Sequence, residues 1–248
     1  MIISQQEEII IRNDQAETYE DWYLKKGVLF DWVERKSILN ALNIQKDDIV
    51  LDAGCGTGRL SIEIAKKCKK IYALDFSQKS IDILNKKIND QKIKNIETFV
   101  WDITKPLPLN EKIDKVLSIQ VIQHIPTESK RLETLKIFYD QLKIRGECLF
   151  SVYNFNFQSG EKIMKEGEFS SGFYYLRFTP EEVDNLFKKS GFKNTSVAGC
   201  INFKGYGRLS KYNIYRLFYF VAALDVFLSK FRFSCFLGNF LMVKGQKV

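Results

Sequence analysis

The sequence is poor in the residues from which metal sites and disulfide frameworks are built. It has a single histidine, His124, with no second histidine or clustered pair of carboxylates beside it, so no metal site is expected. The five cysteines are odd in number and widely spaced, with no C-x-x-C pair (Cys55, Cys68, Cys148, Cys200 and Cys235). This pattern argues against a disulfide framework or a zinc site and is typical of a reducing compartment.

Long apolar runs are missing as well. The apolar stretch 217–224 is far shorter than the roughly 20 residues that a bilayer-spanning helix needs. The N-terminal region carries several acids and no long apolar run, which excludes a secretory signal there. No internal repeat or low-complexity tract appears. We therefore expect a cytoplasmic protein without a transmembrane segment.

The composition is that of a globular protein. Of its 248 residues, 45% are hydrophobic and 27% are charged, which suits one domain with a sizeable core. The net charge of +8 is spread over lysines on the expected outer faces of helices. It favours an anionic partner, whether RNA, acidic lipid or a phosphorylated substrate, without choosing among them.

The most informative stretch is residues 50–58, V-L-D-A-G-C-G-T-G, where an apolar strand leads through Asp52 into three alternating glycines. Glycine can adopt positive φ and lets a ligand lie against the backbone, and the following helix points free N–H groups at the same spot. The spacing differs from the dinucleotide fingerprint G-x-G-x-x-G, and Gly58 is not followed by the Lys-Ser/Thr of a phosphate loop. The turn therefore predicts a ligand site, and both phosphate-binding motifs are disfavoured.

Strand and helix patterns alternate along the chain. Helices over 15–42 precede strands at 49–53, 71–75, 97–101, 115–120 and 147–153, with intervening helices near 58–68, 78–89 and 128–143, the last closed by Gly146. Alternation of this kind predicts parallel strands with helices on both faces. Ligands bind such sheets beyond the carboxyl ends of the strands, where Asp52, Asp75, Asp102 and Gln120 fall. Asp75 stands about 20 residues past the glycine loop, a position suited to ribose hydroxyls.

Three features of the chain belong together: the D-x-G-x-G-x-G turn at 52–58, the strand ends at Asp75 and Asp102, and the segment 114–125. They resemble the motifs of class I S-adenosylmethionine-dependent methyltransferases, in particular of a methyltransferase type 11/25-like domain. The resemblance covers about residues 45–200. It implies a Rossmann-like, doubly wound α/β fold with a mostly parallel seven-stranded sheet. The last two strands are expected near 195–202 and at 237–244, with the final one antiparallel. The implied cofactor is S-adenosylmethionine.

The same resemblance implies roles for the cofactor-site residues. The glycine loop cradles the methionine moiety and Asp52 orients it, Asp102 meets the adenine amino group, and the backbone N–H of Ile103 meets a ring nitrogen. The small side chain of Cys55 is interpreted as packing inside the loop. The complete expected cofactor set is Asp52, Gly54, Cys55, Gly56, Asp75, Phe76, Asp102, Ile103 and Gln120.

Several residues are candidates for the acceptor side. His124 follows the fourth strand and is either a catalytic base or a residue that caps the turn into the next helix. Tyr19, Trp22 and Tyr23 lie in the N-terminal helix, which in relatives commonly closes over the cofactor. Tyr153 and Asn154 stand at the end of the fifth strand. For the three aromatic residues of the helix, packing in the core is the alternative to lining the pocket.

We expect one methyltransferase domain over 1–248, with the cofactor-binding core at about 45–154. Acceptor or lid elements are expected at about 1–44, in the aromatic segment 154–178 and in the basic segment 204–232. A strong helix start, Thr179-Pro180-Glu181-Glu182, lies between the last two. The apolar part of 204–232 has three interpretations: an interfacial helix giving peripheral membrane contact through 213–232, a lid, or a helix packed on the core.

Three hypotheses remain for the overall activity. In the first, the enzyme methylates a small molecule, for instance a lipophilic, quinone-like or sugar acceptor, which the aromatic segments suit. In the second it modifies RNA, because segment 118–131 resembles tRNA wobble-uridine carboxymethyl methyltransferases and positive charge favours phosphate contacts. However, the N-terminal helices lack a dense Lys/Arg cluster. In the third it is a non-catalytic protein that binds S-adenosylmethionine, although the intact acids at 52, 75 and 102 argue for retained binding.

Overall fold

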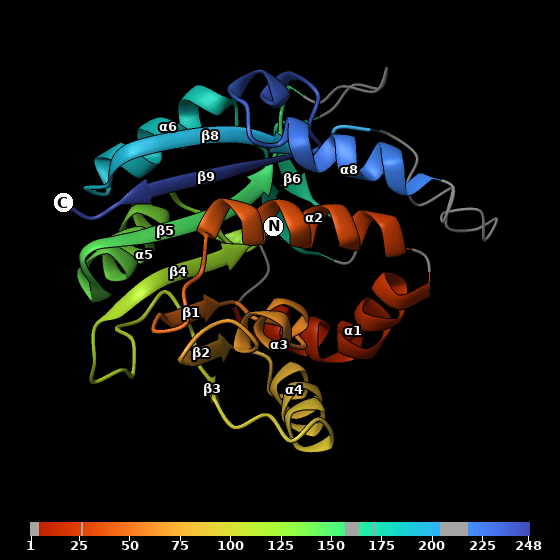
Figure 1. Ribbon diagram of the computed structural model, residues 1–248, viewed down its shortest axis with the longest axis vertical. Helices are drawn as coiled ribbons and strands as arrows, with labels where there is room; N and C mark the ends of the chain where they lie inside the picture. The colour runs from red at the N-terminus through yellow and green to blue at the C-terminus, as the bar shows by residue number, and fades with distance from the viewer. Residues whose placement is uncertain (1–4, 26, 157–163, 171, 204–217) are drawn as a thin grey trace.

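The computed structural model describes residues 5–25, 27–156, 164–170, 172–203 and 218–248. One seven-stranded sheet runs through the molecule, with helices against both of its faces (Figure 1). In sequence order its strands are β1 (Ile49–Ala53), β2 (Lys70–Asp75), β3 (Ile96–Val100), β4 (Ile113–Ile119), β5 (Leu142–Tyr153), β8 (Lys193–Cys200) and β9 (Phe240–Gln246).

The strands lie in the order β3-β2-β1-β4-β5-β9-β8. The first five pair in parallel, and β9 runs antiparallel to both of its neighbours, β5 and β8. This arrangement confirms the predicted Rossmann-like α/β sheet with its antiparallel last strand. The strand order switches between β1 and β4, so the connections that leave these two strands run in opposite directions and leave room for a ligand at their carboxyl ends.

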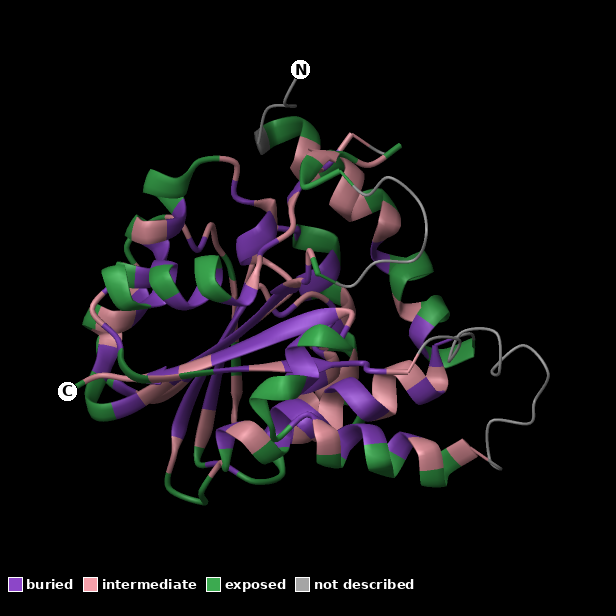
Figure 2. Cartoon of the chain, turned by 90° about the horizontal axis from the view of Figure 1, so that it is seen from above, coloured by how far each residue is buried: buried purple, intermediate pink, exposed green. Residues whose placement is uncertain are grey.

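Helices cover the two faces of the sheet unequally. One face is covered by α2 (Val28–Leu42), α3 (Arg59–Ala65), α4 (Gln78–Asp90) and α8 (Tyr219–Leu228), and the other by α5 (Glu128–Gln141) and α6 (Pro180–Lys189). Figure 2 shows the result: the central strands are buried, and the outer faces of the helices are exposed. A strand buried on both faces needs a continuous apolar run, and all five residues of β1 are buried.

Side-chain caps explain why several helices begin where the sequence predicts. Ser77, Thr127 and Thr179 each accept a hydrogen bond from a backbone N–H in the first turn of α4, α5 and α6. At α6 the Glu182 carboxylate also accepts a hydrogen bond from the Thr179 backbone N–H, which completes a capping box.

Two expected boundaries are wrong. The N-terminal helical region was expected from residue 15, but α1 (Gln5–Lys25) extends ten residues further toward the N-terminus. The apolar residues of its early turns are the consecutive run Ile9–Ile11, which shows no helical period. The helix expected to be closed by Gly146 ends at Gln141, and β5 begins at once with Leu142 in extended conformation. Gly146 therefore lies inside a strand, where the pairing of β4 with β5 shifts register.

The aromatic segment 154–178 forms a small separate sheet. Strands β6 (Glu166–Glu168) and β7 (Tyr174–Leu176) pair antiparallel, and a bridge between Asn154 and Phe178 ties the segment to the end of β5. Residues 157–163 and 171, which belong to the expected lid, lie outside the described residues.

The basic segment 204–232 is described only from residue 218 onward, so its first part falls outside the described residues. Within the described part, α8 packs on α2, and Ala222 and Val226 join the core on that face of the sheet. The short helix η3 (Arg232–Phe236) follows and packs on β8. None of the helices in the described ranges is long and apolar enough to span a membrane.

A buried carboxylate fastens α8 to the end of β8. Asp225 is fully buried, and its oxygens accept bonds from the backbone N–H groups of Asn202 and Phe203 at 2.8 to 3.1 Å. The side-chain amide of Asn202 donates a further bond of 2.7 Å to Asp225. We expect Asp225→Ala to lower the free energy of unfolding by about 2–4 kcal/mol, because it leaves two buried backbone donors unpaired.

Urea unfolding followed by circular dichroism measures this loss. Asp90→Ala, at an exposed acid that ends α4, serves as the control and should change stability by less than about 0.5 kcal/mol. Equal stability of the two variants would show that Asp225 does not hold α8 in place.

Candidate active site

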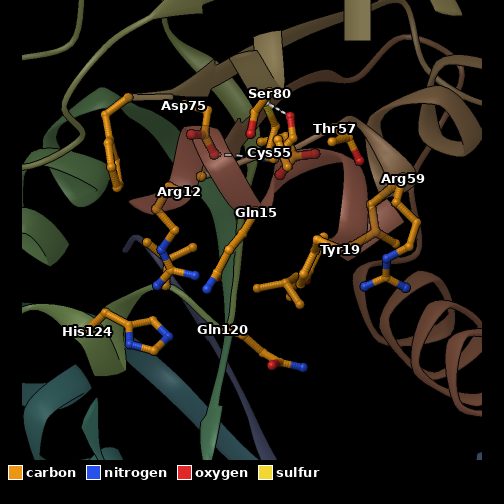
Figure 3. Close-up of a pocket in the computed structure, with 18 of the residues that line it drawn as sticks. Arg12, Gln15, Tyr19, Cys55, Thr57, Arg59, Asp75, Ser80, Gln120 and His124 are labelled. Atoms are coloured by element: carbon orange, nitrogen blue, oxygen red, sulfur yellow. Dashed lines mark hydrogen bonds between the residues drawn. The ribbon is translucent and has the colours of Figure 1, made fainter. Parts of the chain in front are cut away.

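A cavity lies beyond the carboxyl ends of β1, β2 and β4, where the fold favours ligand binding. Its wall is formed by the glycine loop after β1, by Asp75 and Phe76 after β2, and by Ile119–Val121 after β4. Helix α1 supplies the remaining side (Figure 3). Segments that are far apart in the sequence thus enclose one site.

The glycine loop has two kinds of glycine. Gly56 and Gly58 both have positive φ, at 53° and 80°. A Cβ on Gly58 would stand 2.1 Å from Cδ1 of Leu84, so this glycine allows α4 to approach the loop. A Cβ on Gly56 would meet nothing within 4 Å. Gly56 therefore presents bare backbone to the open cavity, as a cradle for a closely fitting ligand requires.

Two carboxylates lie beside this loop, of which Asp52 is buried and Asp75 half-buried. Asp75 accepts bonds from the backbone N–H groups of Gly56 and Ser77 at 2.8 and 2.9 Å, and burial raises its pKa. Asp52 accepts a 2.5 Å bond from the Ser61 hydroxyl, and burial raises its pKa to about 6. With a pKa of about 6, Asp52 is mostly ionised at neutral pH, and the oxygens of both carboxyl groups make this part of the cavity suited to hydroxyl donors and positive charge.

Helix α1 covers the cavity with one face. Glu8, Arg12, Gln15 and Tyr19 all line it, at helical spacing along α1. In Figure 3, Arg12, Gln15 and Tyr19 lie between Asp75 and Cys55 on one side and His124 and Gln120 on the other. The polar residues Glu8, Arg12 and Gln15 were missed in the sequence, because a search for apolar periodicity does not find a polar face.

Contacts with α4 and the glycine loop hold α1 over the site. The Asn13 side-chain oxygen accepts bonds from the Ser77 hydroxyl at 2.7 Å and from the Lys79 backbone N–H at 3.1 Å. Glu20 pairs with Lys87 at 2.5 Å and accepts a bond from the Thr57 hydroxyl. These contacts fix α1 to the start of α4 and to the glycine loop.

His124 follows the carboxyl end of β4 and lines the cavity there. Its Nδ1 is 2.7 Å from the Tyr174 carbonyl oxygen, which makes Nδ1 the protonated nitrogen. The Gln123 side-chain oxygen accepts a 2.6 Å bond from the Tyr153 backbone N–H, so its amide NH₂ faces His124 Nε2 at 3.3 Å. Burial, and secondarily the Arg12 guanidinium, lower the pKa of His124 to about 3. The ring is therefore neutral at physiological pH.

Aromatic rings surround His124. The ring centroids of Tyr153, Phe169 and Phe173 lie 6.1, 6.4 and 6.4 Å from the imidazole, and burial raises the pKa of Tyr153 to about 12. The guanidinium of Arg12 stands 3.9 Å above the Phe173 ring. This end of the site is therefore apolar, with a single cation at its edge.

A charged network closes the opposite side of the cavity. Arg59, which lines the cavity, donates to Asp31 and Glu34, each at 2.5 Å, and lies 4.3 Å above the Tyr23 ring. The Gln120 amide donates a 2.5 Å bond to the other oxygen of Glu34. The sequence analysis missed Arg59 and Glu34, because contacts between α2 and α3 bring them together.

The cavity brings together ten of the fifteen residues proposed from the sequence: Asp52, Gly54, Cys55, Gly56, Asp75, Phe76, Gln120, His124, Tyr19 and Tyr153. Trp22, Tyr23, Asp102, Ile103 and Asn154 do not line it. Trp22 and Tyr23 pack edge-on against each other, and Trp22 packs in the same way against Phe30. Tyr23 is buried, as in the alternative of packing in the core, whereas Trp22 is 38% exposed.

The three other residues have structural partners. The Asp102 carboxylate accepts bonds from the backbone N–H and hydroxyl of Thr104, and Ile103 is buried in the core. The Asn154 amide donates to the carbonyls of Cys235 and Gly238, both at 2.7 Å. Asn154 therefore holds η3 to the end of β5 and is turned away from the cavity.

The comparisons with known proteins agree with this geometry. A family profile described as "Methyltransferase domain" matches residues 44–197. A protein of Methanocaldococcus jannaschii, named "Probable cobalt-precorrin-6B C(15)-methyltransferase (decarboxylating)", is 30% identical over 141 residues, which are 51% of this chain and 77% of that protein. A protein of the same name from Methanococcus vannielii is 38% identical over 96 residues, covering 38% of this chain and 53% of its own length.

A solved structure from Thermotoga maritima, described as a SAM-dependent methyltransferase and possible histamine N-methyltransferase, superposes with a TM-score of 0.68 at 20% identity. The match covers 96% of this chain and 99% of that one. At this identity the likeness establishes the fold, and the family profile, which spans more than half of the chain, establishes the family. The chain belongs to the class I S-adenosylmethionine-dependent methyltransferase superfamily.

Proposed function

We propose that this protein transfers the methyl group of S-adenosylmethionine to a small-molecule acceptor bound beside His124, and that residues 1–248 act as one methyltransferase domain. The observation that carries the proposal is the single cavity that joins the glycine loop, Asp75, α1, His124 and Tyr153. One end has the groups that a nucleoside and an amino-acid moiety need, and the other end is aromatic and shielded.

The residues at the first end fit S-adenosylmethionine. The open space over Gly56 accommodates the methionine chain, and the ionised Asp52 suits its positive ammonium group. Asp75, at the carboxyl end of β2, accepts bonds from ribose hydroxyls, with Phe76 beside it. Asp102 and Ile103 follow the neighbouring strand β3 and extend the site on the adenine side. Cys55 packs within the loop, and burial raises its pKa well above the usual value, so it is a thiol there.

The cofactor supplies an activated methyl group on a sulfonium. What the chain must do is hold the acceptor in line with that methyl and exclude water, and such positioning alone contributes about 7–11 kcal/mol to catalysis. Tyr19, Arg12 and the aromatic residues around His124 form the shielded surface for this. Because α1 and its contacts cover the site, a compact acceptor fits it better than a base within an RNA duplex. The name of the Methanocaldococcus jannaschii relative also specifies a small-molecule acceptor.

His124 remains the candidate base in this proposal. Its neutral ring accepts the acceptor's proton at Nε2 once the Gln123 amide releases that nitrogen. With a pKa of about 3 the ring then gives the proton to water, which carries it out of the site. We expect His124→Ala to keep the affinity for S-adenosylhomocysteine within about threefold while lowering turnover by roughly 10²-fold or more. At saturating S-adenosylmethionine, the rate of the unchanged protein should show no inflection from His124 near pH 6.5, since the ring is neutral on both sides of that pH; the titration of Asp52 near pH 6 should instead change the affinity for the cofactor.

Calorimetry with S-adenosylhomocysteine and initial rates between about pH 5.5 and 8.5 measure these effects. A tenfold or greater loss of affinity in His124→Ala would contradict its placement at the acceptor end. Full activity of that variant would contradict its role as a base.

The proposed function itself is tested with methyl-labelled S-adenosylmethionine and cell extract, followed by fractionation of the label. We expect label in a low-molecular-mass product, and none with Asp75→Ala, which lacks the ribose ligand. Label that stays with RNA through phenol extraction would overturn the small-molecule proposal in favour of the RNA hypothesis. Saturable binding of S-adenosylhomocysteine without methyl transfer to any fraction would favour the non-catalytic one.

A further inference from the structure

The outer face of α8 and the turn after it is apolar and exposed. Seven exposed apolar side chains lie along α8 and the turn after it, and we call them together the aromatic ridge: Phe220, Leu224, Phe227, Phe231, Phe233, Phe236 and Leu237. Phe220 and Phe236 are 81% and 73% exposed. Phe220, Leu224 and Phe227 share one face of α8 by helical spacing, while Ala222 and Val226 on the opposite face are buried in the core.

The ridge is held in place from beneath. Asp225 anchors α8 to the end of β8. The Ser234 hydroxyl accepts a 2.7 Å bond from the Gly199 backbone N–H of β8 and donates to the Phe231 carbonyl at 2.6 Å. Figure 1 shows α8 beside α2 at the end of the sheet where β8 is the edge strand. The apolar surface is therefore a fixed feature of the fold.

Positive charge accompanies the ridge. Lys230 and Arg232 alternate with its phenylalanines and are exposed, and the one acid in 218–237, Asp225, is buried. Lys230 lies 5.8 Å from the Phe227 ring centroid. In the part of the chain that the structure describes, neither cation forms an ion pair. Arg232 helps to lower the pKa of Asp184, but the ion-pair partner of Asp184 is Lys188. The preceding sequence, residues 204–217, carries four more cations and no acid.

A second cavity opens beside these cations. Lys230, Arg232 and Lys244 line it together with Ser37, Asn40 and Thr195, and no carboxylate is among its lining residues. Lys230 and Arg232 suit a phosphate group, whereas Lys244 already pairs with Glu147 at 3.0 Å and the Thr195 hydroxyl donates to Asp184 at 2.6 Å. Phe231 and Phe233 flank Arg232 along the chain, and apolar side chains next to such cations match the layout of a bilayer surface, where acyl chains lie next to phosphates.

We propose that the aromatic ridge docks on a membrane surface that contains anionic phospholipid. Its phenylalanines and leucines enter the boundary between headgroups and acyl chains, while Lys230, Arg232 and the adjoining cavity meet lipid phosphates. The charge complementarity selects this occupant, because a purely apolar partner would leave both cations unmatched. The proposal is independent of methyl transfer and of the acceptor.

Vesicle flotation with the full chain tests the proposal. Vesicles of neutral phosphatidylcholine are compared with vesicles that contain about 30 mol% phosphatidylglycerol. The double variant Phe220→Ser/Phe236→Ser removes the two most exposed phenylalanines of the described ranges, and neither packs against another aromatic ring within those ranges, so it should fold. Ile144→Ser, at a 67% exposed position on β5, is its control. Lys230→Gln/Arg232→Gln tests the charge, with the exposed pair Lys66→Gln/Lys69→Gln as its control.

We expect the unchanged protein to bind the anionic vesicles at least about tenfold better than the neutral ones, and less in about 0.5 M NaCl. Each ridge variant should lose most of this binding, roughly fivefold or more, and neither control should. No vesicle binding, or equal loss in controls and ridge variants, would overturn the proposal. So would a dimer in sedimentation that dissociates in Phe220→Ser/Phe236→Ser, because the ridge would then be covered by a second copy.

Discussion

Asp75→Ala should weaken the binding of S-adenosylhomocysteine by about 10²-fold. In the proposed complex this carboxylate accepts bonds from ribose hydroxyls, and a hydrogen bond to a charged group contributes about 1.5–3 kcal/mol. The substitution also removes the acceptor for the backbone N–H groups of Gly56 and Ser77. The loop that carries the methionine moiety therefore loses a support at the same time.

Calorimetry on folded protein measures this change. Asp82→Ala is the matched control, since Asp82 is an exposed acid on α4 that accepts a bond only from the Gln78 side chain among the hydrogen bonds of the described residues. It should leave the affinity unchanged. An unchanged affinity in Asp75→Ala, with a melting temperature near that of the parent, would refute the assignment of the ribose site.

Gly56→Ala should abolish most cofactor binding while leaving the fold intact. A Cβ here meets no protein atom within 4 Å, so it enters the space proposed for the methionine chain. Overpacking a close contact costs about 1–3 kcal/mol, which corresponds to roughly 5- to 100-fold in affinity. Stability should fall only by the ~1–2 kcal/mol expected for a non-glycine residue at positive φ.

Gly58→Ala provides the contrast in the same loop. Its Cβ would stand 2.1 Å from Leu84, so this variant should lose more stability than Gly56→Ala. Thermal unfolding and titration with S-adenosylhomocysteine, carried out on both variants, separate the two glycines. If Gly56→Ala bound the ligand as well as the parent, the cradle would have to lie elsewhere in the cavity.

The glycine loop and the strand ends could be predicted because their signals are local. The run Ile49–Ala53 is continuously apolar up to Asp52 and is followed by glycines, and the structure has β1 at these residues. The order of motifs along the chain then predicted the sheet, whose topology is confirmed. Fold and cofactor class were both accessible in this way, because each depends on residues within a few positions of one another.

The other side of the site could not be predicted in the same way. Arg12 and Arg59 come from opposite sides of the cavity, and their surroundings depend on how α1 and α2 pack over the loop. Asn154 and Trp22 are the opposite case, because the sequence proposed them for the site and neither lines the cavity. Both stand at positions next to the site along the chain, yet backbone carbonyls and neighbouring rings engage their side chains elsewhere.

The amino-acid sequence alone determined the sheet, the glycine cradle and the row of acids at the strand ends, since apolar runs, glycines and carboxylates act over short distances along the chain. Only the tertiary structure decided which side chains close the cavity, why the single histidine is neutral, and that one face of α8 is left exposed. Those properties arise from burial and from contacts between distant segments, which have no local signature in the sequence.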